Sequence, residues 1–180
     1  MNLPKIRFAA HAVNQIKKNQ FMEASLPEGA NRVQEFLRSK DSKLNVELLP
    51  DNTATAQNAA DALNVKLNQI GKSIAFGNNY ETVVALVSGD RRINVDLLLA
   101  QLESSEIYLL KPDEVKRKTG FAIGGVSPFA LPSNINVFID ERLCSLSKFY
   151  VAAGHPKAVV SVQKRDIVGL AGAKICSISF

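Results

Sequence analysis

The sequence is poor in the residues that build metal centres and disulfide frameworks. Its 180 residues include two cysteines and two histidines. Cys144 and Cys176 lie far apart in the sequence and form no C-x-x-C pair, so they indicate neither a zinc site nor a set of disulfides. Asp, Glu and His residues do not cluster at metal-ligand spacing. We therefore expect a chain without metal or cofactor, in a reducing compartment such as the cytoplasm.

Long hydrophobic runs are also missing. No stretch approaches the ~18 consecutive apolar residues that a membrane span needs. The first residues, Met1 to Arg7, lack the apolar segment and the small-residue cleavage site of a signal peptide. The sequence thus predicts a soluble, unexported protein with no membrane partner.

Positive charge is what the sequence has in excess. The formal net charge is +5 and the pI is near 9.3, which favours polyanionic partners such as nucleic acid. Solvated surface lysines explain the same excess equally well. Because 46% of the residues are hydrophobic, the chain can bury one sizeable core, and its length fits a single domain.

Hydrophobic periodicity predicts helices and strands in mixed order. Residues 5–21 carry apolar side chains at helical spacing among Lys and Arg residues, which predicts a basic amphipathic helix at the N-terminus. Further helices are predicted at residues 28–40, 56–63, 95–102, 112–120 and 164–170, and strands at residues 45–49, 69–76, 81–87, 107–110, 135–139, 149–152, 158–162 and 174–178. Hairpin and crossover connections both occur in this order, without a repeat or linker. We expect one α/β or α+β domain with a mixed, barrel-like sheet flanked by helices.

The segment from Thr119 to Phe129 is the most informative candidate for a ligand site. It contains Gly124-Gly125, followed by Ser127-Pro128. Paired glycines let backbone N–H groups approach a ligand as an anion nest or an oxyanion hole, and proline fixes the direction in which the chain leaves. An ordinary turn before the strand at 135–139 explains the same residues. The spacing is not the G-x-G-x-x-G of a dinucleotide site.

Lys72 lies in a predicted strand, at a position where apolar side chains are expected. Alternation along the strand places it on the face of Ile70, Ile74 and Phe76. A half-buried ammonium group is costly without a partner. Three explanations are open: a structural carboxylate, a side chain that extends to the surface, or an anionic ligand.

Two further polar residues follow predicted strands. His155 lies in a turn of small residues after the strand at 149–152, and Asp140 ends the strand at 135–139. Each is a candidate for contact with a ligand, but a local structural role is the simpler explanation of its position. No Ser-His-Asp triad can be assembled from the sequence, so a conventional nucleophilic enzyme is not predicted.

Several short motifs occur together and in register. They are Thr53-Ala54-Thr55-Ala56, Gln69-Ile70-Gly71-Lys72-Ser73, Val87-Ser88-Gly89-Asp90-Arg91-Arg92, Lys111-Pro112-Asp113-Glu114-Val115, Thr119-Gly120, Gly124-Gly125-Val126-Ser127-Pro128-Phe129 and Tyr150-Val151-Ala152-Ala153-Gly154-His155-Pro156. Over residues 25–180 the chain resembles the YbaK family, the free-standing relatives of the editing domain inserted in bacterial prolyl-tRNA synthetases. Residues 1–24 lie outside the resemblance and form the expected N-terminal extension.

The resemblance implies hydrolysis of the ester that joins a wrong amino acid to the 3′ end of a tRNA, typically Cys or Ala attached to the tRNA for proline. Lys72 matches the functional lysine of the family, and Gly124, Gly125, Ser127 and Pro128 match its glycine loop. The family is thought to act without a protein nucleophile, with a substrate ribose hydroxyl that helps to position or activate water. The implied partners are the 3′ acceptor end of tRNA and an aminoacyl-tRNA synthetase.

Two positions match the family less closely. His155 occupies a position where some relatives carry histidine and others do not, and Ala130 stands where the family commonly has glycine. Two other functions therefore stay open. One is a non-catalytic tRNA-binding or protein-interaction module with the same fold, and the other is a small-molecule enzyme that binds phosphate at the same anion site.

Overall fold

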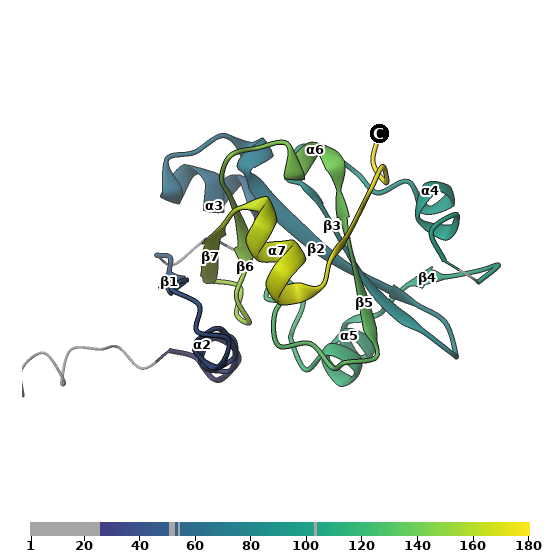
Figure 1. Ribbon diagram of the computed structural model, residues 1–180, viewed down its shortest axis with the longest axis horizontal. Coiled ribbons are helices and arrows are strands. Elements are labelled where there is room, and N and C mark those ends of the chain that lie inside the picture. Colours follow the sequence, from purple (N-terminus) through teal and green to yellow (C-terminus); the bar gives the residue numbers. More distant parts are fainter. Residues whose placement is uncertain (1–25, 51–52, 54, 103) are drawn as a thin grey trace, which may run out of the picture.

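The computed structural model describes residues 26–50, 53, 55–102 and 104–180. The predicted helix at residues 5–21 and the predicted domain boundary after residue 24 lie outside the described residues. The described residues form an eight-stranded mixed sheet with helices packed against it (Figure 1). The prediction of a mixed sheet flanked by helices is confirmed.

The elements alternate irregularly along the chain. The strands are β1 (Val46–Leu48), β2 (Ile70–Gly77), β3 (Thr82–Ser88), β4 (Tyr108–Leu109), β5 (Ile135–Asp140), β6 (Phe149–Ala152), β7 (Ala158–Val162) and β8 (Lys174–Cys176). The helices are α2 (Glu28–Ser39), α3 (Ala56–Leu63), the 3-10 turn η1 (Leu67–Gln69), α4 (Val95–Leu99), α5 (Pro112–Thr119), α6 (Glu141–Cys144) and α7 (Lys164–Ala171).

The strand order is β1-β7-β6-β2-β3-β5-β8, and β4 pairs with β2 as well. The pairs β2–β3, β6–β7 and β1–β7 are antiparallel. The pairs β2–β6, β3–β5 and β5–β8 are parallel. Hairpin and crossover connections are thus combined in one sheet, as the order of predicted elements indicated.

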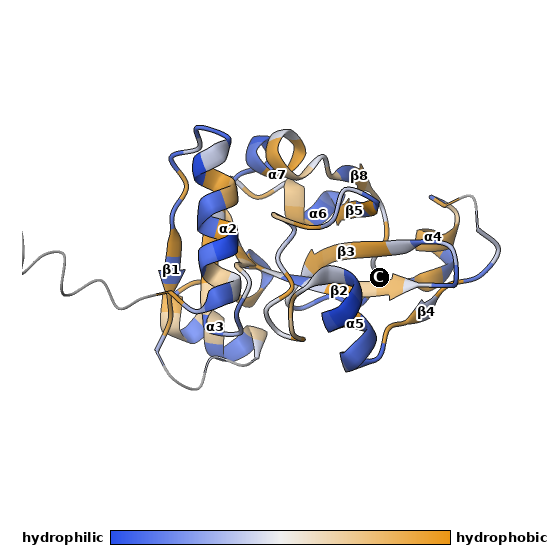
Figure 2. Ribbon diagram, turned by 90° about the horizontal axis from the view of Figure 1, so that it is seen from below, coloured by the Kyte–Doolittle hydropathy of each residue, from blue (hydrophilic) through white to orange (hydrophobic). Residues whose placement is uncertain are grey.

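Side-chain alternation along β3 divides the core into two faces. Val84 and Leu86 belong to the larger cluster, which α2, α5 and α7 cover, whereas Val83, Ala85 and Val87 face the smaller cluster beneath α4. Helix α3 covers a third cluster, at the end of the sheet where β2 and β6 meet. The apolar stripe of α2 faces the core while its polar side faces solvent (Figure 2).

Local signals placed most helix ends correctly. Pro112 opens α5, and Gly120 caps it in the left-handed conformation at φ 77°, which glycine adopts readily. Several predicted elements are too long, and the largest overruns at one end are in α4, which ends at Leu99, and β8, which ends at Cys176. The N–H group of Ile178 donates to the Asp140 carboxylate, so the chain after Cys176 leaves the β5 ladder. The short elements α6 and η1 were not predicted.

Candidate active site

A cavity opens where two parallel strands part. In the described chain, β2 pairs with β6 only at Ile70 and Gly71, and with β4 only at Phe76 and Gly77. The edge of β2 between these pairs has no strand beside it, and a cavity of about 210 Å³ lies there. Its walls come from α3 and the segment before it, β2, the glycine loop, β6 and β7: Thr53, Thr55, Ala56, Ala59, Ile70, Gly71, Lys72, Ser73, Gly124, Val126, Tyr150, Val151, Ala152, Pro156, Ala158 and Val159.

Lys72 supplies the only ammonium group among the described residues that line this cavity. Its Nζ atom donates to the backbone carbonyl oxygen of Arg91 at 2.5 Å, and no described carboxylate forms an ion pair with it. One of its three protons is therefore engaged and two remain for a ligand. Burial lowers the pKa of Lys72 by disfavouring the charged form; the negative charge of Asp90 opposes this shift, and the positive charge of Arg92 adds to it.

The glycine loop forms another wall of the cavity. Gly124 has φ 81°, which glycine adopts without strain, and it lines the cavity together with Val126. Within the described chain, the N–H groups of Gly124 and Val126 donate to no protein acceptor. The fold thus brings Lys72 and Gly124 to one cavity, which is lined by an amine and by two residues whose backbone donors are unused.

Gly125 has a different position from its neighbour. Its N–H group donates to the carbonyl oxygen of Ala122 at 3.0 Å, and its own carbonyl oxygen accepts from Gly154 at 2.9 Å. A Cβ atom at Gly125 would lie 2.8 Å from backbone atoms of His155, so only glycine fits. The expected use of the Gly125 amide as an oxyanion donor is therefore replaced by a role in holding the loop against the turn between β6 and β7.

The other predicted residues of the glycine loop and the β6–β7 turn are outside the cavity lining. Ser127 is fully buried, and its hydroxyl accepts from the N–H group of Phe129. Pro128 is buried beside it. His155 is half-buried, and its Nδ1 atom accepts from the N–H group of Lys157 at 3.2 Å. None of the three lines the cavity, although Pro156, next to His155, does.

Asp140 lies apart from the cavity, which corrects its expected role as a ligand contact. Its side chain is 1% exposed and accepts from two backbone N–H groups, those of Arg142 and Ile178. The carboxylate thus caps α6 and fixes the C-terminal segment. Sequence position alone could not show this, because Ile178 lies 38 residues away.

Most cavity residues were not among the sequence-predicted site residues, and three of them contribute a helix cap, an aromatic ring and a hydroxyl group. Thr55 caps α3 by accepting from Asn58, which fixes the wall that this helix forms. Tyr150 contributes a buried aromatic side chain from β6. Ser73 follows Lys72, and its shielded Oγ atom has no hydrogen-bond partner among described residues. Successive residues of a strand face opposite sides, but a cavity at an open strand edge reaches both.

Two kinds of feature are absent from the described residues. No group of three or more His, Cys, Asp or Glu side chains is arranged to hold a metal ion. None of the described helices has the length and apolar character needed to cross a membrane.

Two similar proteins match parts of this chain. The Bacillus subtilis strain 168 protein YwhH is 27% identical over 124 residues, which are 68% of this chain and 78% of YwhH. A proline–tRNA ligase of Pseudothermotoga lettingae is 30% identical over 106 residues, 58% of this chain. The matching region is 18% of that ligase.

Solved structures share the fold over most of the chain. A crystal structure described as a candidate trans-editing enzyme for prolyl-tRNA synthetase superposes with a TM-score of 0.81 at 31% identity, covering 87% of this chain and 99% of that one. The structure of the hypothetical protein APE2540 gives a TM-score of 0.75 at 28% identity, covering 83% and 99%. The family model described as the aminoacyl-tRNA editing domain matches residues 50–170. This protein therefore belongs to the aminoacyl-tRNA editing domain family.

Proposed function

We propose that this protein is a trans-editing aminoacyl-tRNA deacylase, which hydrolyses the ester between a wrong amino acid and the 3′ end of a tRNA. The observation that carries the proposal is that Lys72 and the unused Gly124 amide line one cavity in a member of the editing-domain family. The expected substrates are Cys or Ala attached to the tRNA for proline. Such a substrate places the site of action in the cytoplasm.

The hydrolysis can be written without a protein nucleophile. Water adds to the ester carbonyl carbon, and the tetrahedral intermediate then breaks its bond to the ribose oxygen. The products are an amino acid carboxylate, a free ribose hydroxyl on the tRNA and one proton. Negative charge develops on the carbonyl oxygen as water adds, so fixed donors near that oxygen lower the barrier.

The cavity supplies such donors from two sides. The Lys72 ammonium binds the ester oxygen or the terminal phosphate, and the Gly124 and Val126 amides face the developing oxyanion. Each well-placed donor is worth about 2.7–4 kcal/mol of barrier lowering. The substrate ribose hydroxyl positions or activates the water, as in the family that the chain resembles.

The remaining loop residues support this arrangement. Gly125 holds the glycine loop through its backbone hydrogen bonds and Ser127 through its hydroxyl, which accepts from Phe129, and Pro128 is buried next to Ser127. His155 contacts the bound substrate at the rim, because its neighbour Pro156 lines the cavity. The small apolar wall from Ala56, Ala59 and Ala158 favours a small aminoacyl group.

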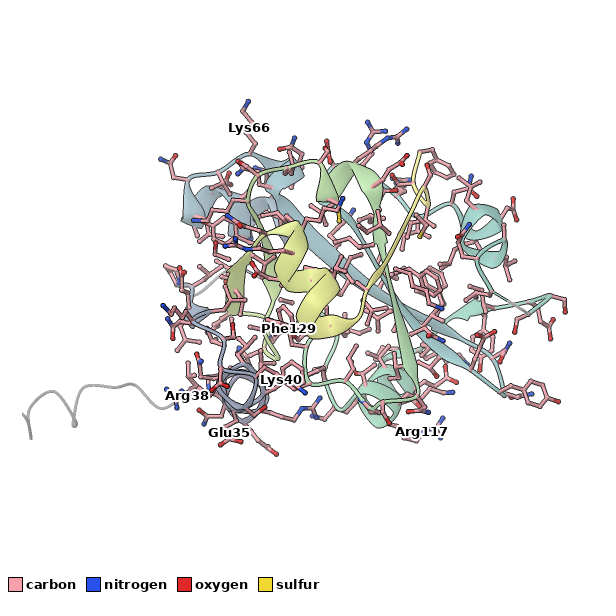
Figure 3. The ribbon with its side chains drawn as sticks, in the orientation of Figure 1. Glu35, Arg38, Lys40, Lys66, Arg117 and Phe129 are labelled. Atoms are coloured by element: carbon pink, nitrogen blue, oxygen red, sulfur yellow. The ribbon has the colours of Figure 1, made fainter. Side chains whose placement is uncertain are left out.

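The test is a panel of charged tRNAs for proline, carrying Cys, Ala, Ser or the correct Pro, incubated with wild type and Lys72→Ala. We expect deacylation of at least one wrong species, with a loss of about 10²-fold or more in Lys72→Ala. Lys66→Ala is the matched control, because Lys66 is exposed and extends into solvent from the turn after α3 (Figure 3).

Three results would count against the proposal. Absence of turnover on every species rejects the deacylase. Binding of tRNA without turnover, with an affinity that falls steeply as salt rises, supports the non-catalytic module instead. Turnover that Lys72→Ala leaves unchanged rejects the assigned cavity.

A further inference from the structure

A basic turn lies next to the cavity and has no role in the chemistry described above. It begins at the last residue of β3 and comprises residues 88–92, with Arg91 and Arg92 at its end. The carbonyl oxygen of Arg91 accepts the hydrogen bond from Lys72 at 2.5 Å, so the turn directly adjoins the cavity amine.

Several contacts hold this turn in one place. The N–H group of Arg91 donates to the carbonyl oxygen of Ser88, which closes the turn. Gly89 packs so closely on Leu67 that a Cβ atom would lie 2.6 Å from the Leu67 carbonyl oxygen. On the far side, the carbonyl oxygen of Arg92 accepts from Phe180, and Ile93 bridges to Ser179. The two arginines are therefore carried on a fixed support.

The charges of the turn are not neutralised within the described chain. Neither guanidinium forms a hydrogen bond or an ion pair with a described residue. Arg92 is exposed and Arg91 is half-buried. Arg92 lies close enough to Lys72 for its positive charge to lower the pKa of that amine, and the negative charge of Asp90 acts on the amine in the opposite sense. Like charges held together on a rigid support cost free energy unless an anion binds between them.

We propose that Arg91 and Arg92 bind a backbone phosphate of the tRNA acceptor end while the terminal ester occupies the cavity. The inference rests on the proposed deacylase function. If the ester carbonyl lies between Lys72 and Gly124, the next phosphate along the strand is one sugar away, and the turn that bonds Lys72 carries the two guanidinium groups beside that position. Guanidinium groups suit this ligand because their paired N–H groups match two phosphate oxygens.

In this proposal the basic turn binds phosphate and the cavity hydrolyses the ester. Two substrates can distinguish these two roles. Aminoacyl-tRNA carries the backbone phosphates, whereas 2′(3′)-O-aminoacyl-adenosine carries the ester and no phosphate. Arg91→Gln, Arg92→Gln and the double variant would be compared with wild type on both, at several salt concentrations.

Arg117→Gln is the matched control for net charge. Arg117 lies on α5 and points outward at the lower edge of Figure 3. Its neighbour Lys118 bonds Thr82, at the opposite end of β3 from the turn. Seven residues of strand separate the two ends by roughly 20 Å.

We expect Arg92→Gln to raise KM for aminoacyl-tRNA roughly tenfold and to reduce the steepness of its salt dependence by about 0.7 per lost phosphate contact. Hydrolysis of aminoacyl-adenosine should stay within about twofold of wild type, since it lacks the group that the turn binds. Arg117→Gln should change neither KM nor the salt dependence.

Three outcomes would overturn the inference. One is an unchanged KM for aminoacyl-tRNA in the double variant, and another is an equal loss in Arg117→Gln. The third is an equal loss on aminoacyl-adenosine. If wild type hydrolyses neither substrate, the deacylase proposal fails by itself, and binding of uncharged tRNA for proline to the same variants then decides whether the turn binds phosphate.

Discussion

The guanidinium carbon of Arg32 lies 3.8 Å from the centroid of the Phe121 ring, at the start of the glycine loop. The same side chain donates to the carbonyl oxygens of Thr119 at 2.8 Å and Ala130 at 3.1 Å. One residue of α2 thus holds both ends of the loop that carries Gly124. The geometry of the cavity wall therefore depends on a helix that contributes no residue to the cavity.

Replacing Arg32 with lysine should weaken this attachment, because an ammonium group cannot match the planar fork that stacks on Phe121 while bonding two carbonyl oxygens. We expect the free energy of unfolding to fall by about 2 kcal/mol. Urea denaturation measures the change. Arg38→Lys, an exposed position on the same helix, should stay near wild type, and an unchanged midpoint in Arg32→Lys would contradict the assigned role.

Replacing Lys72 with methionine should separate activity from stability. Methionine lacks the ammonium group, so deacylation should be lost. Its apolar side chain also places no charge in the partly buried site, so the fold should not be destabilised. Because burial lowers the folded-state pKa of Lys72, its charged form disfavours folding at neutral pH. That unfavourable contribution is complete below the lowered pKa and disappears as the pH rises through it toward the unfolded value.

Lys72→Met should therefore be at least as stable as wild type at pH 7, and the difference should shrink as the pH approaches the ordinary lysine pKa of about 10.4. Thermal unfolding at several pH values measures this. A less stable variant at pH 7, with activity lost in parallel, would mean that Lys72 acts mainly through the fold.

Alanine at the two adjacent loop glycines should have different effects. At Gly125 the new Cβ atom would press on the His155 backbone, so we expect a loss of about 1–3 kcal/mol in the free energy of unfolding. At Gly124 it would meet only Pro156 side-chain atoms at 3.5 Å, and the cost is the left-handed backbone, about 1–2 kcal/mol.

Activity distinguishes these variants further. Gly124→Ala should lower kcat more than its stability loss explains, because the side chain narrows the cavity beside the free amide. Kinetics at a temperature where both variants are fully folded provide the comparison. Equal kcat for Gly124→Ala and wild type would remove the Gly124 amide from the proposed mechanism.

Ala130 is a site where glycine should stabilise the protein. Its φ angle is 56°, in the left-handed region that L-residues other than Asn and Asp rarely adopt. The left-handed conformation costs alanine about 1–2 kcal/mol, while glycine adds unfolded-state entropy worth about 0.4–1 kcal/mol. Ala130→Gly should thus raise the free energy of unfolding by roughly 0.5–1 kcal/mol in urea denaturation.

The control for this prediction is Ala100→Gly. Ala100 has the ordinary right-handed φ of −62°, so glycine there should lower stability. A lower free energy of unfolding in both variants would show that glycine relieves no backbone strain at residue 130.

The sequence by itself determined the elements and one part of the site. Periodicity of two and of 3.6, with Pro112 and Gly120 as end signals, located β2, β3, α5 and their neighbours to within a few residues, because these signals act over one or two turns of chain. The same local reasoning identified Lys72 as a half-buried amine. Family motifs added the glycine loop.

Tertiary structure alone decided which of these residues meet. The cavity exists because β6 leaves β2 after Gly71. The Gly125 N–H group is not free for a ligand, because it donates to Ala122 in a turn that packs on His155. The Asp140 carboxylate accepts hydrogen bonds from the backbone N–H groups of Arg142 and Ile178, so it has a structural role away from the cavity. The contacts of Gly125 with His155 and of Asp140 with Ile178 join residues tens of positions apart, and their energies depend on how whole elements pack, so no local pattern encodes them.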